Sequence, residues 1–340
     1  MKKNIKYSVI IVLYLGLIPI FHSCKKEEVP TLTTDAITNV TNSGATCGGN
    51  ITSEGTGTVI NRGVCWSITN SNPTITNNKT FDGSGTGSFI SSVTGLNGGT
   101  KYYIRAYATN SSGTGYGNII TFTTNDIPKT VTDIDSNIYN VVTIGTQIWM
   151  KENLKVSRYR NGDPILTGLS DSNWSTTTSG AYTIYNNDNL NNVTYGKIYN
   201  WYSVSDNRQL CPTGWHVPSD YECNQLAAFA DPDGMTTDLT GIWISNSAGA
   251  KLKEAGTLHW LPPNSDATNQ TGFTALPSGL VGGDGQFYWI GTFTDFWTST
   301  EYTNDTTLVW FIELNCYNPG IWHYHRNKVN GISVRCILDN

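Results

Sequence analysis

The chain has 340 residues, which is room for about two domains of ordinary size. Hydrophobic residues make up 38%, aromatic residues 11% and charged residues only 14% of it, a composition typical of folded domains and not of a disordered chain. The net charge of −5 argues against a nucleic-acid partner, because binding to phosphates needs clustered lysine and arginine.

Residues 1–23 have the pattern of a signal peptide. Three lysines precede the apolar run Val9–Phe21, which is too short to span a membrane as a permanent helix. The run leads to Ser23 and Cys24, which resembles the lipobox of bacterial lipoproteins, although Phe21 departs from the usual pattern. In that family the cysteine becomes the acylated first residue. We therefore expect Cys24 to carry fatty acyl chains such as palmitate and to hold the protein on a membrane.

Residues 24–28 combine this anchor with a short charged spacer. The run Lys25–Glu28 resembles the export signals that send Bacteroidetes lipoproteins to the outer face of the outer membrane. The alternative is a solvated spacer without a sorting role. The sequence thus predicts a lipid-anchored protein of the bacterial outer membrane that faces the cell exterior.

Residues 29–124 form the first predicted domain. Short alternating runs separated by Gly, Asn, Ser and Thr predict an all-β sandwich. The stretch Leu96–Asn110 resembles the corner and F strand of a fibronectin type III-like domain, with Tyr102 as the corner tyrosine. Arg62–Ser67 resembles its C strand, which makes Trp66 a core residue. The glycine-rich run 82–88 lacks the Gly-Lys-Ser/Thr ending of a phosphate loop, so no nucleotide site is expected.

Residues 125–134, with Pro128, are a predicted linker to a second domain at 135–340, which holds ten of the eleven tryptophans. Six ordered motifs carry a family resemblance; they are Ile144–Leu154, Gly196–Tyr202, Cys211–Glu222, Thr271–Gly279, Phe296–Glu301 and Gly331–Cys336. They resemble the Fibrobacter succinogenes major paralogous domain family. The resemblance implies a C-type-lectin-like α+β fold, and no enzymatic activity defines the family.

Local signals agree with an α+β fold. Ser219 and Glu222 form a capping box that starts a helix, and a second short helix is expected at 248–255, stopped by Gly256. Short strands and long Gly/Asn loops follow, and Trp215 and Trp297 are expected in the core.

Six cysteines remain after Cys24, an even number in a compartment where disulfides persist. Cys47 and Cys65 can pair within the first domain. In the second, Cys211 precedes the capped helix and Cys336 lies in the last strand, and we expect them to form a structural disulfide. A Cys223–Cys316 bridge would be particular to this sequence. Buried free thiols are the alternative for every pair.

No catalytic residue is predicted, because the sequence contains no Gly-x-Ser-x-Gly, His-Glu-x-x-His or Cys-x-x-Cys motif. His323 and His325 share one face of a predicted strand, where a hydrogen-bonded or solvated pair is favoured over a metal site. The runs Asp231–Gly234 and Glu313–Asn315 could supply oxygens to Ca²⁺. Neither spells a sugar-binding motif, so no cofactor is expected.

Aromatic and polar side chains late in the chain form the predicted ligand site. These residues are Trp260, Tyr288, Trp289, Trp322, His323, Tyr324 and Arg326. Rings of this kind stack on sugars while the polar groups bond hydroxyls, although the same tryptophans could instead fill the core. The predicted function is non-catalytic recognition or adhesion at the cell surface, with a glycan or protein ligand. The alternatives are a surface enzyme acting on glycans or peptides, and a structural subunit of an envelope assembly.

Overall fold

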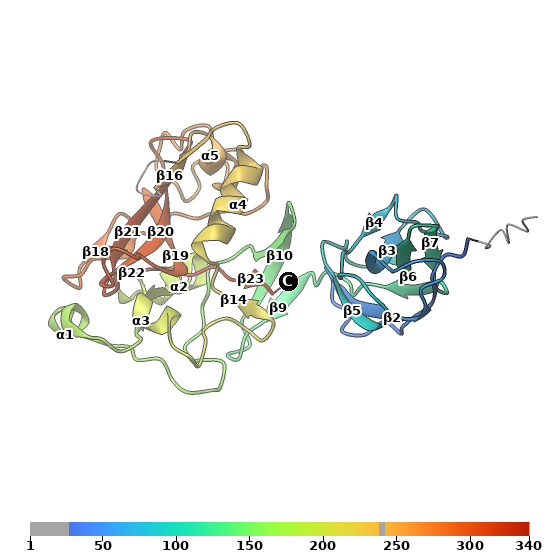
Figure 1. Ribbon diagram of the computed structural model, residues 1–340. Coiled ribbons are helices and arrows are strands. Elements are labelled where there is room, and N and C mark those ends of the chain that lie inside the picture. The colour runs from blue at the N-terminus through green and yellow to red at the C-terminus, as the bar shows by residue number, and fades with distance from the viewer. Residues whose placement is uncertain (1–26, 238–241, 340) are drawn as a thin grey trace, which may run out of the picture. The chain divides into compact units, whose positions relative to one another are not determined.

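A computed structural model describes residues 27–237 and 242–339 (Figure 1). The predicted signal peptide and the predicted anchor Cys24 lie outside the described residues. The chain divides into two compact units, with the boundary between Thr124 and Asn125. None of the helices in the described ranges is long and apolar enough to cross a membrane.

The first unit is a sandwich of two antiparallel sheets. One sheet has the order β1 (Thr31–Thr34), β2 (Ala45–Ser53), β5 (Gly87–Val93). The other has the order β4 (Asn78–Lys79), β3 (Asn61–Ser67), β6 (Lys101–Asn110), β7 (Gly113–Tyr116), with β8 (Ile120–Thr123) also paired to β6. The predicted β-sandwich is confirmed by this pairing.

The core of the first unit follows from strand alternation. Val64 and Trp66 on β3 and Tyr102 and Ile104 on β6 point into one apolar cluster between the sheets. The Tyr102 hydroxyl accepts a hydrogen bond from the Asn97 backbone N–H at 2.8 Å, as expected of a corner tyrosine. Both the buried Trp66 and the corner tyrosine are therefore confirmed.

The smaller sheet of the second unit joins strands from its two ends. Its order is β14 (Trp215–His216), β23 (Ile337–Leu338), β11 (Gln147–Met150), β10 (Ile138–Ile144), β9 (Thr130–Thr132). Trp149 on β11 lies opposite Ile337 on β23. Residues 130–132, which the sequence placed in the linker, pair with β10 because Val131 packs beside Tyr139.

The larger sheet carries most of the late motifs. Its order is β12 (Tyr182–Thr183), β13 (Ile198–Asn200), β22 (Gly331–Ser333), β19 (Phe293–Glu301), β20 (Leu308–Asn315), β21 (Ile321–Asn327), β16 (Trp243–Ser245), β15 (Met235–Thr237). The short strands β17 (Leu280–Val281) and β18 (Phe287–Tyr288) pair with each other, and β17 also pairs with β22.

Short helices connect these strands. They are α1 (Asp171–Thr176), the 3-10 turn η1 (Tyr185–Asn187), α2 (Asn189–Tyr195), α3 (Trp201–Val204), α4 (Asp220–Ala230) and α5 (Ala248–Leu252). Helix α4 begins with the predicted Ser219–Glu222 capping box. Helix α5 ends at Leu252 and not at residue 255, because Lys253 is extended and bridges to Ala275.

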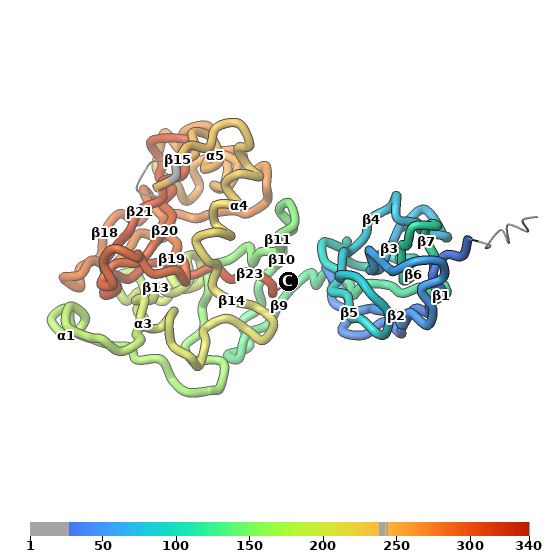
Figure 2. The backbone as a smooth tube through the Cα atoms, in the orientation of Figure 1, coloured from blue at the N-terminus to red at the C-terminus, as the bar shows by residue number. Residues whose placement is uncertain are grey.

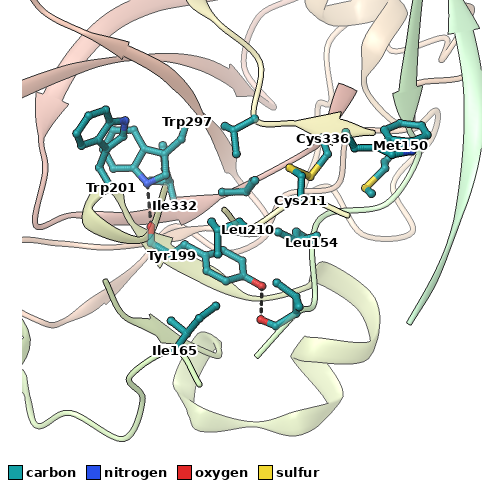
Figure 3. Packing of buried hydrophobic residues seen from close by; sticks show 14 of the residues in the cluster. Met150, Leu154, Ile165, Tyr199, Trp201, Leu210, Cys211, Trp297, Ile332 and Cys336 are labelled. Carbon is teal, nitrogen blue, oxygen red and sulfur yellow. Dashed lines mark hydrogen bonds between the residues drawn. A yellow bond between two sulfur atoms is a disulfide. The ribbon is translucent and has the colours of Figure 1, made fainter. Parts of the chain in front are cut away.

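Two large apolar clusters lie on opposite faces of the larger sheet. Helices α4 and α5 cover one face, where they share a cluster with Phe296, Ile312 and Leu314. Strands β19–β21, orange to red, lie beside the yellow helix α4 (Figure 2). The second cluster surrounds Tyr199, Trp201 and Trp297, and the Trp297 Nε1–H donates to the Tyr199 carbonyl at 2.8 Å (Figure 3). The predicted burial of Trp215 and Trp297 is confirmed.

The predicted disulfide between Cys211 and Cys336 is present, with its sulfurs bonded inside the second cluster (Figure 3). It ties the loop before α4 to the C-terminal strand region across a separation of 125 residues. This bond links the middle of the second unit to its C-terminal end.

The other four cysteines are buried free thiols, which corrects the two further bridges. Cys47 lies in the sandwich core, whereas strand alternation turns Cys65 to the opposite face of β3, where its sulfur contacts the Pro73 carbonyl at 3.5 Å. Cys223 and Cys316 share the α4–α5 cluster as small apolar residues. Burial raises the pKa of both thiols, which keeps them protonated and unreactive.

Candidate functional site

One face of strands β19, β20 and β21 gathers acidic, basic and aromatic side chains from late in the chain. The strand register places Asp295 opposite Glu313, and Glu313 opposite Trp322. Alternation adds residues two positions away on each strand. We call this set the β19–β21 face; it comprises Phe293, Asp295, Trp297, Phe311, Glu313, Trp322, Tyr324 and Arg326.

Two carboxylates and a guanidinium lie at the centre of this face. Asp295 has no exposed surface, and its Oδ2 lies 2.9 Å from Nη2 of Arg326, which reaches it across the ring of Phe311. Burial raises the pKa of Asp295 to about 7; Arg326 opposes the rise and the charge of Glu313 adds to it. Burial also raises the pKa of Glu313. At neutral pH the two opposed carboxylates therefore hold part of a proton.

A pair of aromatic rings lies beside this charge cluster. The rings of Trp322 and Tyr324 have centroids 6.0 Å apart and planes only 7° from parallel. Tyr324 is 38% exposed and Trp322 is half-buried. The Trp322 Nε1–H donates to Asn318 Oδ1 at 3.3 Å, which fixes the indole. The two parallel rings thus form a stacked, partly exposed aromatic pair next to Glu313 and Arg326.

A second exposed aromatic group lies at the Phe293 end of the face. Trp289 is 49% exposed and has a φ of +63°, a backbone conformation that bulky residues rarely adopt. Its carbonyl accepts N–H bonds from Thr292 and Phe293 at 3.1 and 3.0 Å, which hold the turn. Its ring lies 5.2 Å from that of Phe293, and Phe293 lies 6.2 Å from exposed Tyr317. Strained residues of this kind concentrate at functional sites.

The structure brings together only part of the predicted ligand site. Trp322, Tyr324 and Arg326 share the β19–β21 face, and Trp289 is exposed near its end. Tyr288 is half-buried, and its hydroxyl donates to Asp284 Oδ2 at 2.6 Å.

Trp260 is a correction to the predicted site. It is only 1% exposed, packs in the α4–α5 cluster and donates its indole N–H to the Ala275 carbonyl at 2.9 Å. Its ring and its polar group are both used inside the core, so no surface remains for a ligand.

His323 is the second correction, because alternation turns it to the opposite face from Trp322. It is fully buried, stacks on Trp310 at 4.1 Å and contacts Asp220 Oδ1 at 2.6 Å. His325 shares that face, as predicted, and stacks on Tyr302 at 4.3 Å. The histidine pair is therefore part of an aromatic stack and not of the ligand site.

Two of the side chains considered for calcium, Asp231 and Asn315, hold a turn or the start of a helix. Asp231 Oδ2 accepts bonds from Ser245 Oγ at 2.6 Å and from the Ser247 N–H at 2.9 Å, just before α5. Asn315 Oδ1 accepts from the backbone N–H of Tyr317 at 3.0 Å. Within residues 27–237 and 242–339, no group of three or more His, Cys, Asp or Glu side chains could hold a metal ion.

Sequence reasoning did not connect Asp295, Phe293 and Tyr317 with the site. The available signal was an acidic residue in the otherwise apolar and aromatic strand Phe293–Trp297. An acid at such a position is buried unless the strand is at an edge, and buried acids need a partner. The identity of that partner depends on the strand register.

The comparisons with known proteins cover the two units separately. The model of the Fibrobacter succinogenes major domain matches residues 142–338. No curated protein matches the chain. The sensor domain of the anti-sigma factor RsgI4 of Pseudobacteroides cellulosolvens is 16% identical, with a TM-score of 0.23, over 29% of this chain and 98% of that chain. The third fibronectin III domain of human KIAA0343 protein is 15% identical, with a TM-score of 0.23, over 30% of this chain and 88% of that chain.

Proposed function

We propose that this chain, which belongs to the Fibrobacter succinogenes major domain family, is a lipid-anchored surface protein that recognises a glycan without catalysing a reaction. The ligand site is the open part of the β19–β21 face. The first unit is a spacer between the anchor and the family domain, and the family domain is a C-type-lectin-like module. The pairing of β11 with β23 and the Cys211–Cys336 bond support that last relationship.

The observation that carries the proposal is the stacked and partly exposed Trp322–Tyr324 pair beside Glu313 and Arg326. A sugar ring has an apolar face of C–H groups that packs on aromatic rings. Its rim carries hydroxyls, which can donate to the Glu313 carboxylate and accept from the Arg326 guanidinium. The site thus offers stacking, an acceptor and a donor within one short stretch of sheet, which is the combination a polar ligand needs for orientation.

One observation favours the enzymatic alternative. Asp295 and Glu313 are directly opposed carboxylates, and a raised pKa on one member of such a pair is typical of glycoside hydrolases. However, Asp295 has no exposed surface and is ion-paired to Arg326. A general acid must reach the bond it protonates, so binding is the better interpretation.

Single substitutions test the binding site. Trp322→Ala and Trp289→Ala should each weaken binding of a soluble hexasaccharide by about 1–3 kcal/mol with little change in melting temperature, because both rings are partly exposed. The measurement is titration calorimetry against cello-, xylo- and mannohexaose, combined with thermal melts and a reducing-sugar assay for hydrolysis.

Two control variants separate loss of binding from loss of stability. Tyr221→Ala removes a more exposed aromatic ring, on α4 and outside the β19–β21 face, and should change neither binding nor stability. Trp260→Ala should cost roughly 3–5 kcal/mol of unfolding free energy because its ring is in the core. Unchanged affinity in both Trp322→Ala and Trp289→Ala contradicts the site, and release of reducing sugar supports the enzyme.

The anchor has a test of its own. Cys24→Ala should move the protein from the membrane fraction to the soluble fraction and abolish labelling with a palmitate analogue, because the acylated residue is lost. Fractionation and click labelling of wild type and variant measure this, with Cys47→Ala as the control. Continued membrane attachment of the Cys24 variant contradicts the predicted lipoprotein.

A further inference from the structure

The side chain of Arg335 lies apart from the β19–β21 face. A cavity of about 220 Å³ opens beside it and is lined by Lys151, Glu152, Asn153, Glu254, Thr274 and Arg335, among others. This volume is below the roughly 300–1,000 Å³ of pockets that take drug-sized ligands, so it suits a smaller molecule.

Arg335 is a buried cation that makes no ion pair with any residue the structure describes. Its Nε and Nη2 donate to Asn153 Oδ1 at 3.2 and 2.6 Å, and its Nη1 donates to the Phe273 carbonyl at 2.5 Å. A guanidinium has five N–H groups, so these three bonds leave two donors for a further acceptor. Burial lowers the pKa of Arg335 to about 9, because the charged guanidinium is separated from water. A bound anion would reduce the free-energy cost of burying this charge.

The groups around Arg335 are fixed before any ligand arrives. Asn153 donates from Nδ2 to the Tyr195 carbonyl at 2.9 Å and to Ser333 Oγ at 3.2 Å. The Arg335 guanidinium also lies over the Phe273 ring, 4.2 Å from its centroid. A cation oriented in this way can bind a planar carboxylate through two parallel N–H bonds.

Two glutamates give the cavity a negative side. Glu152 accepts from the N–H and the Nδ2 of Asn140 at 2.7 and 2.8 Å. Glu254 accepts from His259 Nδ1 at 2.9 Å. Each carboxylate has further lone pairs, so both can still accept from a ligand ammonium group. With Lys151 and Arg335, the lining carries two positive and two negative groups, which fits a ligand with both charges.

The cavity is lined by residues from three sequence motifs that contribute nothing to the β19–β21 face. Lys151, Glu152 and Asn153 come from the segment Ile144–Leu154. Thr274 comes from Thr271–Gly279, and Arg335 from Gly331–Cys336. Three of the segments on which the family resemblance rests therefore meet at one hollow.

The geometry points to this cavity as a binding site for a small zwitterion, a free α-amino acid or a molecule of the same chemistry. The carboxylate would lie against the two open N–H groups of Arg335, and the ammonium group against Glu254 and Glu152. The site is independent of glycan binding, because none of its residues belongs to the β19–β21 face.

Calorimetry and thermal melts on the complete chain test this proposal with glycine, L-alanine and L-glutamate as probes. Acetate and methylamine are the matched single-charge probes. At least one amino acid should bind saturably at millimolar concentration or below and raise the melting temperature, and acetate and methylamine should bind more weakly by about tenfold. Absence of binding by all three amino acids overturns the proposal, and acetate binding as tightly as an amino acid overturns the assignment to a zwitterion.

Two variants spare Arg335, whose loss could unfold the domain. Thr194→Trp places a large ring on an exposed lining position of α2 and should abolish binding. Glu254→Gln should weaken amino-acid binding by about tenfold and leave acetate binding unchanged. Glu301→Gln, on β19 and away from the cavity, is the control and should behave as wild type. Equal affinity in wild type, Thr194→Trp and Glu254→Gln overturns the site.

Discussion

Three buried charges in the second unit are satisfied in different ways. The Lys253 ammonium donates to the carbonyls of Asn315, Asn318 and Ser265 at 2.9, 3.0 and 3.3 Å, so its donors are all used. Arg335 has three bonds to neutral acceptors, and Asp295 has one guanidinium. An incompletely paired buried charge costs free energy. We therefore associate Arg335 and Asp295 with candidate binding sites, whereas Lys253 is fully hydrogen-bonded and has only a structural role.

The Asp295–Glu313 pair predicts a pH-dependent stability. The folded pKa of Asp295, about 7, is above its ordinary value, so the folded state binds more protons than the unfolded state between about pH 4 and pH 7. Stability from this pair is therefore present at acidic pH and lost as the pH rises through that window. Glu313→Gln removes one carboxylate and its repulsion of Asp295. The variant should therefore lose less stability than wild type as the pH rises, and should be more stable than wild type at pH 8 by roughly 1 kcal/mol.

Urea unfolding at pH 5 and pH 8 measures this difference. Glu301→Gln, a carboxylate with a 47% exposed side chain, is the control and should keep the wild-type pH dependence. A Glu313→Gln variant whose stability falls as steeply with pH as that of wild type would show that the two carboxylates are not coupled.

Strand alternation predicted which side chains share a face but not which face is covered. It correctly placed His323 and His325 on one face. The predicted ligand site was instead grouped by composition late in the chain, which joined Trp322, Tyr324 and Arg326 but also included His323, which points the other way beneath α4. Trp260 has turn-forming neighbours that indicate a surface, although its ring is in the core. Asp295 and Glu313 lie on consecutive strands, and only the register of β19 with β20 places them opposite each other.

At the scale of elements, the best predictions were those with a local physical cause. The Ser219–Glu222 box satisfies backbone donors of α4 within one helical turn, so four residues contain the whole signal. Helices α1, α2 and α3 were not predicted, because they have only four to seven residues and are fixed by their surroundings. The end of α5 depends on the distant bridge between Lys253 and Ala275, which no local pattern contains.

The Cys211–Cys336 bond predicts a large stabilisation of the second unit. Removing it with Cys211→Ala and Cys336→Ala together should lower the unfolding free energy by about 2–5 kcal/mol, because a cross-link over 125 residues strongly restricts the unfolded chain. Chemical denaturation with and without reductant measures this. Reductant should destabilise wild type and leave the double variant unchanged, and Cys223→Ala, which removes a free thiol, should remain sensitive to reductant. A wild type that is fully reduced yet equally stable would contradict the role assigned to the bond.

At the scale of the whole molecule, each unit has its own core. The sandwich cluster contains residues of the first unit only, and the clusters around Trp297, around α4 and around Trp174 contain residues of the second unit only. The composition of the chain already indicated this division, since Trp66 is the one tryptophan before residue 125. A domain with a complete core can fold alone.

We therefore predict that residues 27–124 and 125–340 fold as separate chains, each with the unfolding midpoint that it has in the longer protein. Trp66 is buried between the sheets and reports on the first unit, so Trp66→Phe should remove the fluorescence change of one transition and leave the other intact. Urea titrations of the two fragments, of the chain from Lys25 and of its Trp66→Phe variant measure this. If the second fragment is unfolded alone, or if the longer chain unfolds in one transition that Trp66→Phe merely scales, the two cores are energetically coupled and the first unit is more than a spacer.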